Sequence, residues 1–326
     1  MNLKEALLSV HDSEWLMEFA KTSGLKELNT PEETADVISE TLLDPQIMME
    51  NMITLHDEDI DFIRYCLKQD QPFLPSSGYY DSADRLRDLQ YGFVVDENMH
   101  FVMPDDVKKA YQKIDTPAFH QKRKKMAWLN DCVSLIPYLY AILSVGDLGT
   151  LYRKHRGFEE TNEEIVMRML PELSGRPHFP CALEGNELIT KGLKESGQEK
   201  RLREIHETIP VSFPSYGEIK DLIQNGYPSK ETSWKKLRHT LIHDFRVSDT
   251  FIDALLNGIW MYIATGNAFS DTLKMIRNES VPVRKEQEES LKAVMTEAWN
   301  HTRMIMCNGD TPEHAMPYTS YIFTDN

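Results

Sequence analysis

Cysteine is scarce in this chain of 326 residues, and its four copies are widely spaced. They stand at Cys66, Cys132, Cys181 and Cys307, and no two of them form a Cys-x-x-Cys pair. Zinc knuckles need such paired thiolates, and small disulfide-stapled domains need a denser set of cysteines. The sequence therefore predicts free thiols in a reducing compartment and no metal site.

Long apolar runs are also missing. No stretch approaches the roughly 20 apolar residues needed to cross a bilayer. The N-terminal sequence MNLKEALLSVHDSEW interleaves acidic side chains with leucines and lacks the basic start and cleavage site of a signal peptide. We therefore expect a cytoplasmic protein without a membrane partner, long enough for more than one domain.

The familiar nucleotide, nucleophile and calcium signatures are absent as well. The chain contains no GxxxxGK[ST] loop, no GxGxxG fingerprint, no GxSxG elbow and no DxDxDG loop. Each of these patterns places glycines or acidic side chains against a specific ligand or nucleophile. Small-molecule enzymology is thus unsupported, and we expect no cofactor.

Basic residues are few in the first third of the chain. Residues 1–106 hold 23 of the 52 acidic side chains but 7 of the 36 lysines and arginines, which is a net charge of −16. The remaining 220 residues are neutral overall. Because such a segment repels phosphate and attracts basic surfaces, we expect residues 1–106 to fold alone and to bind a basic partner, in the same chain or in another, more weakly at high salt. The alternative is that the acidity serves only solubility.

Helix signals dominate what is present. In NTPEET, Thr30 is placed to cap a helix whose first position is Pro31 and whose Glu33 can reach back to the cap. The turn SGLKEL separates this helix from an earlier one. The pattern predicts an acidic helical hairpin over residues 1–43, and it resembles the helix-extension-helix modules of SAP and Rho N-terminal domains.

Residues 44–113 have the element order of a winged helix, three helices followed by a β-hairpin. The hairpin is predicted in FVVDENMHFVMP, with its turn at Asp96 to Asn98. Residues 114–195 repeat this order as a second winged-helix-like unit. There we expect one long apolar helix over 126–145, a shorter helix, a third helix capped by Thr161, and a second hairpin that turns at Gly185 and Asn186. Both units resemble bacterial winged-helix proteins.

A winged helix ordinarily reads DNA with its third helix, but both candidate helices here are acidic. The first, YYDSADRLRDLQYG, sets three aspartates against two arginines, and the second region, GFEETNEEIVMRML, sets four glutamates against Arg168. Carboxylates that face phosphates oppose the electrostatic attraction on which such binding depends. We therefore expect both faces to contact protein.

The remaining segments are predicted to be an α-helical domain over residues 196–310 and a tail over 311–326. Part of this region, WNHTRMIMCNGDTPEH, resembles the segment that precedes a SEC-C zinc tail, but the cysteine cluster of that family is missing and zinc is not implied. The fold class is thus predicted as mainly α with small β-hairpins (α+β): a helical hairpin, two winged-helix-like units and an α-helical C-terminal domain.

The stretch LRHTLIHDF carries the closest resemblance to a catalytic motif. Arg238 and His243 are separated by four residues, and His239 follows the arginine, which resembles the R-x4-H motif of HEPN ribonucleases. In that family the arginine and histidine cut RNA without metal, across a dimer, by acid–base and electrostatic catalysis. The motif has two fixed positions, so chance matches are common. On a helix whose apolar residues face a core, the same side chains can be ordinary solvated residues.

One segment is basic. Residues 108–157 contain ten lysines and arginines against three aspartates. Lys122, Arg123, Lys124 and Lys125 are the candidate nucleic-acid contacts within it. The alternative is a solvated face that pairs with the acidic first third.

Together these observations favour a non-enzymatic intracellular regulatory or scaffolding protein that acts through protein–protein contacts, with a basic protein as the favoured partner. The first alternative is a HEPN-like metal-independent ribonuclease that uses Arg238 and His243. The second is a regulator that binds nucleic acid weakly through residues 108–125.

Overall fold

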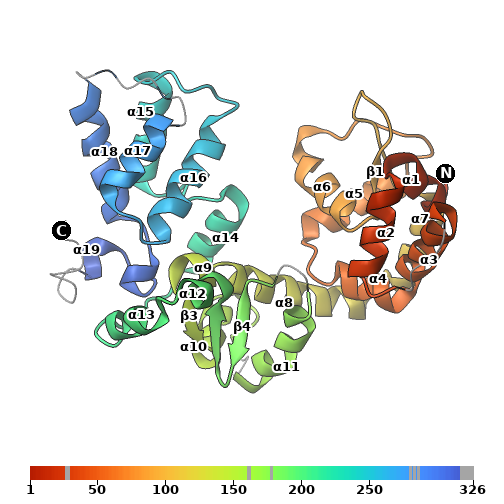
Figure 1. Ribbon diagram of the computed structural model, residues 1–326, viewed down its shortest axis with the longest axis horizontal. Helices are drawn as coiled ribbons and strands as arrows, with labels where there is room; N and C mark the ends of the chain where they lie inside the picture. The colour runs from red at the N-terminus through yellow and green to blue at the C-terminus, as the bar shows by residue number, and fades with distance from the viewer. Residues whose placement is uncertain are drawn as a thin grey trace. The chain divides into compact units, whose positions relative to one another are not determined.

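The computed structural model describes residues 1–25, 30–159, 163–176, 179–278, 281, 284 and 287–315. The chain divides into two compact units, unit 1 from Met1 to Trp128 and unit 2 from Leu129 to Asn326 (Figure 1). Helices dominate both units, and the described strands form two small antiparallel sheets. The predicted fold class, mainly α with small β-hairpins, is confirmed at this level.

Unit 1 is a helical core with one hairpin. Its helices are α1 (Leu3–Val10), α2 (Ser13–Thr22), α3 (Pro31–Leu43), α4 (Pro45–Met52), α5 (Asp57–Cys66), the 3₁₀ turn η1 (Ser77–Tyr79), α6 (Tyr80–Asp88), α7 (Asp105–Ile114) and most of α8 (Pro117–Ser134). Helix α7 packs against α1, α3 and α4, and its Val107 and Tyr111 are fully buried. Residues 1–106 are therefore only part of a folded unit, because they lack α7.

Local capping fixes the helix starts in unit 1. The Thr30 hydroxyl accepts a hydrogen bond from the Glu33 N–H at 3.2 Å, and Pro31 takes the first helical position, as predicted. The expected return hydrogen bond from the Thr30 N–H to the Glu33 carboxylate is not formed among the described residues. Asp44 caps α4 in the same way before Pro45. A proline at the first position removes no helical hydrogen bond, so it marks the start without a cost.

The hairpin predicted in unit 1 is present. Strand β1 (Phe93–Val94) pairs antiparallel with β2 (Phe101–Val102), and Phe73 forms a further antiparallel bridge to Phe101. In the turn, the Asp96 carboxylate accepts hydrogen bonds from two backbone N–H groups at 3.0 and 3.1 Å. A short acidic side chain that bonds the backbone ahead of it is a common way to stabilise such a turn.

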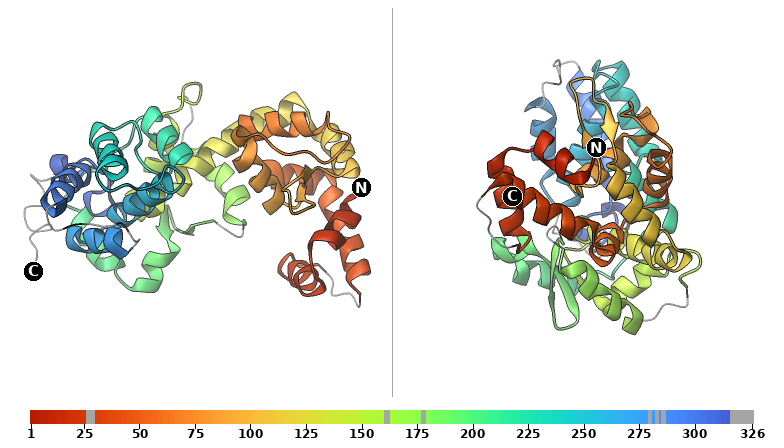
Figure 2. Two further views of the ribbon diagram at one scale, coloured as in Figure 1. Left: turned by 90° about the horizontal axis from the view of Figure 1, so that it is seen from above. Right: turned by 90° about the vertical axis from the view of Figure 1, so that its right-hand side faces the viewer.

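Unit 2 contains a three-stranded sheet in the order β3-β5-β4, with β3 at Ile142–Ser144, β4 at Cys181–Glu184 and β5 at Glu187–Thr190. Strands β4 and β5 form the predicted second hairpin, in which Gly185 adopts a φ of 58° (Figure 2). A positive φ is favourable at glycine, which explains why the turn falls there. The predicted Thr161 cap lies outside the described residues, and α11 is described from Glu163 to Ser174.

The single long helix predicted over residues 126–145 is wrong. Helix α8 ends at Ser134, a short helix α9 (Ile136–Leu139) follows, and β3 then pairs with β5. Pro137 cannot donate a hydrogen bond to the preceding turn, so it interrupts a continuous helix. Ala141 has a φ of 58°, which turns the chain into the strand. The apolar residues of β3 would be buried in a helix as well as in a strand. They are extended here because β5 pairs with them.

The remaining helices of unit 2 are α10 (Val145–Tyr152), α12 (Lys191–Ser196), α13 (Glu199–His206), α14 (Tyr216–Asn225), α15 (Thr232–His243), α16 (Ile252–Ala264), α17 (Phe269–Asn278), α18 (Glu288–Asn300), the 3₁₀ turn η3 (Ile305–Cys307) and α19 (Pro312–Ala315). Helices α15 to α18 pack on one another around buried Trp234, Leu237, Leu241 and Ile259, whereas α10, α11 and α12 accompany the sheet (Figure 1). Within the described part of the chain, no helix has the length and hydropathy needed to span a membrane.

Candidate functional site

The R-x4-H residues lie in the second half of α15 in unit 2, where Arg238 is held by an acidic neighbour. Its Nε lies 3.4 Å from Oδ1 of Asp253 on α16. The same carboxylate oxygen accepts a hydrogen bond from the Tyr227 hydroxyl at 2.9 Å. Burial, together with the bond to Asp253, raises the pKa of Tyr227 to about 12. Arg238 therefore serves a local cluster that joins α15 and α16.

His239 and His243 are exposed and pack together, with ring centroids 4.1 Å apart. They are one helical turn from each other, so they share a face of α15. Arg238 and His243 are five positions apart, and at about 100° per residue they point in directions that differ by about 140°. One chain therefore pairs the two histidines but does not bring Arg238 and His243 together on one face. Their role in RNA cleavage stays a prediction.

In the basic cluster Lys122 to Lys125 of unit 1, Arg123 is buried, unlike its three lysine neighbours. Its side chain is 1% exposed, and its guanidinium donates to the Leu55 carbonyl and to the Asp57 carboxylate. Lys124 adds an ion pair with Asp57 at 3.1 Å. Burial of Asp57 opposes its ionisation, but the hydrogen bonds from Arg123 and Lys124 lower its pKa below the usual value. Arg123 thus belongs to the core of unit 1, whereas Lys122, Lys124 and Lys125 are exposed.

An aromatic surface on unit 1 was missed by the sequence reasoning. The rings of Tyr65 and Phe73 lie with centroids 5.2 Å apart, and those of Tyr65 and Tyr79 lie 5.7 Å apart. Buried Phe62 and Phe101 support them from below, at 5.0 Å from Tyr79 and 6.0 Å from Phe73 respectively. We call Tyr65, Phe73 and Tyr79 the aromatic patch. In the sequence, the aromatic residues of the loop QPFLPSSGYY could have indicated this patch. Hydrophobic periodicity identifies that stretch only as a loop between two helices.

Exposed apolar side chains neighbour the aromatic patch in the sequence. Tyr65 is 39% exposed, and the chain neighbours of Phe73 and Tyr79, which are Leu74 and Tyr80, are 58% and 52% exposed. Large apolar side chains gathered at a surface mark binding sites more often than scattered single ones do. The patch is therefore a candidate contact surface.

Carboxylates outnumber cations in the chain segment that carries the aromatic patch. Residues 57–106 contain 12 acidic side chains and 4 lysines and arginines. The arginines are already paired: Arg64 with Asp61 at 3.2 Å, Arg85 with Asp59 at 2.8 Å and Arg87 with Asp84 at 2.9 Å. The segment that carries the aromatic patch therefore combines apolar contact area with a negative field.

Unit 2 has a cavity of about 510 Å³ that is lined by several charged side chains, and these groups largely satisfy one another. Glu218 pairs with Arg303 at 2.9 Å and caps α14, and the buried Asp221 accepts hydrogen bonds from Asn225, Ser229 and Lys230. Glu231 caps α15. These carboxylates organise the fold around the cavity, and few are left for a ligand.

Neither thiol chemistry nor a metal centre is indicated. All four cysteines are free and buried, and burial raises the pKa of Cys66, Cys181 and Cys307 to about 12 and that of Cys132 well above its usual value. Thiols held neutral in this way are poor nucleophiles. Among the described residues, no group of three or more histidines, cysteines and acidic residues is placed to hold a metal ion.

Comparison of the chain with protein-family models, with curated proteins and with solved structures found no match.

Proposed function

We propose that the protein is a non-enzymatic regulatory or scaffolding protein that binds a basic protein partner through the aromatic patch of unit 1. The observation that carries the proposal is the contact of Tyr65 with Phe73 and Tyr79, whose chain neighbours Leu74 and Tyr80 are exposed. Aromatic side chains dominate the energetics of protein interfaces because they bury a large area at a small loss of conformational entropy.

The charge of the same region selects the partner. A basic segment with apolar side chains gains both the burial of its apolar groups and the attraction of the surrounding carboxylates. Nucleic acid lacks this complementarity, because its phosphates are repelled by a unit with 24 acidic against 14 basic residues over 1–128. The electrostatic part acts mainly on the rate of association and on selectivity, and it weakens with salt.

The five-part division into a hairpin (1–43), two winged-helix-like units (44–113 and 114–195), an α-helical domain (196–310) and a tail (311–326) belongs to this proposal. The order α10, α11, β4, β5, with β3 paired beside the hairpin, supports a winged-helix-like unit within 114–195. The described side chains of α11 that are exposed include Glu163, Glu164 and Glu172 against Arg168. Such a face suits contact with protein better than contact with a phosphate backbone.

The alternatives have weaker support from the geometry. A nucleic-acid regulator would use the exposed Lys122, Lys124 and Lys125, without Arg123. A HEPN-like ribonuclease would require a second chain to complete a site with Arg238 and His243. A metal-free RNA cleavage assay in which both Arg238→Ala and His243→Ala abolish activity would favour the ribonuclease.

The proposal is tested by selecting binders of the full-length protein from a library of random 15-residue peptides. Selected peptides are expected to combine lysine or arginine with aromatic or aliphatic residues. Their affinity should fall about tenfold or more in Tyr80→Ala and in Leu74→Asp, since interface hot spots are worth more than about 1.4 kcal/mol. It should also fall as salt is raised.

Tyr216→Ala is the matched control, because Tyr216 is an exposed tyrosine of unit 2 and is 37% accessible. The control should bind the selected peptides as the wild type does. Absence of enrichment, enrichment of acidic peptides, or equal losses in Tyr80→Ala and Tyr216→Ala would contradict the proposal.

A further inference from the structure

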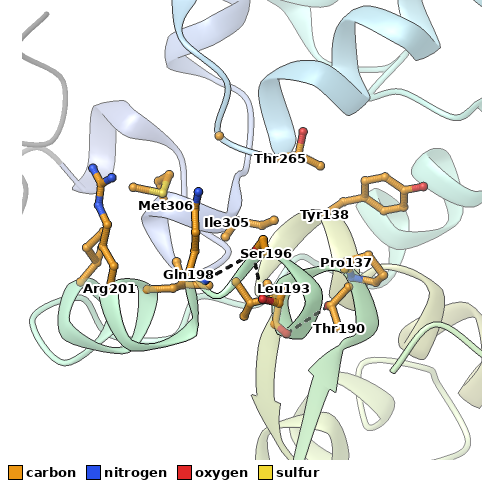
Figure 3. A pocket seen from close by; sticks show the side chains of 15 residues that line it. Pro137, Tyr138, Thr190, Leu193, Ser196, Gln198, Arg201, Thr265, Ile305 and Met306 are labelled. Atoms are coloured by element: carbon orange, nitrogen blue, oxygen red, sulfur yellow. Dashed lines mark hydrogen bonds between the residues drawn. The ribbon is translucent and has the colours of Figure 1, made fainter. Parts of the chain in front are cut away.

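A second cavity of unit 2, with a volume of about 530 Å³, has a single charged side chain, Arg201, in its lining. It is bounded by α9, the end of β5, α12, α13, η3 and the turn that follows α16 (Figure 3). Small-molecule sites typically have volumes of about 300–1,000 Å³ and are mostly apolar with a few polar groups. Both conditions are met here.

The apolar wall of this cavity is part of the hydrophobic core. Ala141 and Leu202 belong to a buried cluster with Ile142 and Ile189, and Leu193, Ile305 and Met306 pack against that cluster while still partly accessible. All but Ile142 and Ile189 line the cavity. Because these side chains are anchored in packed structure, the wall is formed before any ligand arrives.

Gly266 brings the turn after α16 close to Met306. Its φ is 82°, and a Cβ at this position would lie 2.8 Å from Cγ of Met306. Glycine is therefore required both by the backbone conformation and by the close approach. A larger residue at this position would therefore displace Met306 or the turn, both of which border the cavity.

Most hydroxyl groups of the lining are already committed to the backbone. The Thr190 hydroxyl donates to the Ala141 carbonyl at 3.0 Å, and the Ser196 hydroxyl donates to the Leu193 carbonyl at 2.8 Å. The Thr265 hydroxyl donates to the carbonyl of Met261 at 2.7 Å. These groups close helix and strand ends, so their protons are not available for hydrogen bonds to a ligand.

Arg201 is the one ionisable side chain of the lining that carries a full charge, and over the described part of the chain it has no hydrogen bond or ion pair. It extends from α13 at the edge of the cavity, and Gln198, which precedes that helix, also lines the cavity (Figure 3). Its helix neighbour Arg203, by contrast, is bound by Glu187 and Glu199. A guanidinium presents a planar set of donors that matches a carboxylate, and the pair gains from charge-assisted hydrogen bonds.

We infer that this cavity binds a small carboxylic acid with an apolar body. The apolar part lies against Leu193, Ile305 and Met306, and the carboxylate is held at the rim by Arg201. An amine would be repelled by the arginine. A phosphate dianion would find a single cation, Arg201, in the lining. The inference concerns unit 2 and does not depend on the aromatic patch of unit 1.

The test uses octanoate as the probe and the full-length protein, with binding measured by calorimetry. Saturable one-site binding is expected with a Kd of about 1 mM or lower. Octylammonium, which has the same chain and the opposite charge, should bind at least tenfold more weakly. Arg201→Gln should weaken octanoate by about two- to fivefold, since Arg201 is exposed and an ion pair at an exposed side chain is worth about 0.2–1 kcal/mol.

Lys200→Gln is the matched control, because Lys200 is an exposed cation of the same helix that does not line the cavity. A second variant, Gly192→Phe, places a ring at a lining position where a Cβ meets no atom within 4 Å. It should reduce octanoate binding with little change in thermal stability. The inference is overturned if octanoate shows no saturable binding up to about 10 mM, if octylammonium binds equally well, or if Arg201→Gln behaves like Lys200→Gln.

Discussion

Among single residues, Arg123 is buried in unit 1, although its lysine-rich segment predicted an exposed contact for nucleic acid. Its guanidinium is bonded to Leu55 and Asp57, and its Nε has no hydrogen-bond partner among the described residues. A buried charge of this kind is kept in place by its partners, and its removal leaves the Leu55 carbonyl unsatisfied. The side chain also contributes its apolar stem to the core.

We therefore predict that Arg123→Ala lowers the free energy of unfolding by about 2–4 kcal/mol. Lys124→Ala, at an exposed neighbour, should change it by less than about 0.5 kcal/mol. Urea unfolding of the full chain, followed by circular dichroism, provides the comparison. Equal stabilities of the two variants would show that the Arg123 contacts do not hold unit 1 together.

Among the elements, β5 and α13 are joined by a bidentate ion pair. Arg203 on α13 donates to Glu187 of β5 at 3.2 and 2.7 Å, and these hydrogen bonds lower the pKa of Glu187 below its usual value. Because the folded-state pKa is lower than the unfolded one, the pair stabilises the fold above the unfolded value of about 4.3. That contribution is lost as the pH falls through the folded-state pKa.

Glu187→Gln should accordingly flatten the pH dependence of stability below about pH 4.3 and reduce the stability at neutral pH. Glu195→Gln, at an exposed residue of α12 that has no hydrogen bond or ion pair with any other described residue, should retain the wild-type slope. Melting temperatures measured from pH 3 to pH 7 distinguish them. An unchanged slope in Glu187→Gln would mean that the ion pair is as weak as an ordinary surface contact.

At the scale of the whole molecule, the compact unit that contains the acidic segment ends at Trp128, whereas the charge distribution suggested a boundary at residue 106. Unit 1 extends to Trp128, and it includes α7 together with the part of α8 that carries buried Phe119 and Arg123. We predict that residues 1–128 unfold cooperatively when isolated, whereas residues 1–106 do not. Amide exchange of the two fragments measures this difference. Protected amides throughout fragment 1–106 would contradict the assignment of α7 to the core.

The sequence by itself determined the local features of this protein. The start of α3 at Thr30 and Pro31, the turn at Asp96 and the turn at Gly185 follow from interactions within a few residues, which any fold of the chain preserves. The charge partition is likewise a property of the sequence. These signals gave the fold class, but they could not give the partner of any apolar segment.

Only the tertiary structure decided the features that join distant parts of the chain. The apolar run at Ile142–Ser144 is extended because β5 pairs with it. Arg123 is buried because the carbonyl of Leu55, 68 positions earlier, accepts its hydrogen bond. The aromatic patch and the apolar cavity likewise gather residues from separate elements. Such contacts depend on which surfaces exclude water together, and periodicity along the chain records only that a side chain is apolar, not what covers it.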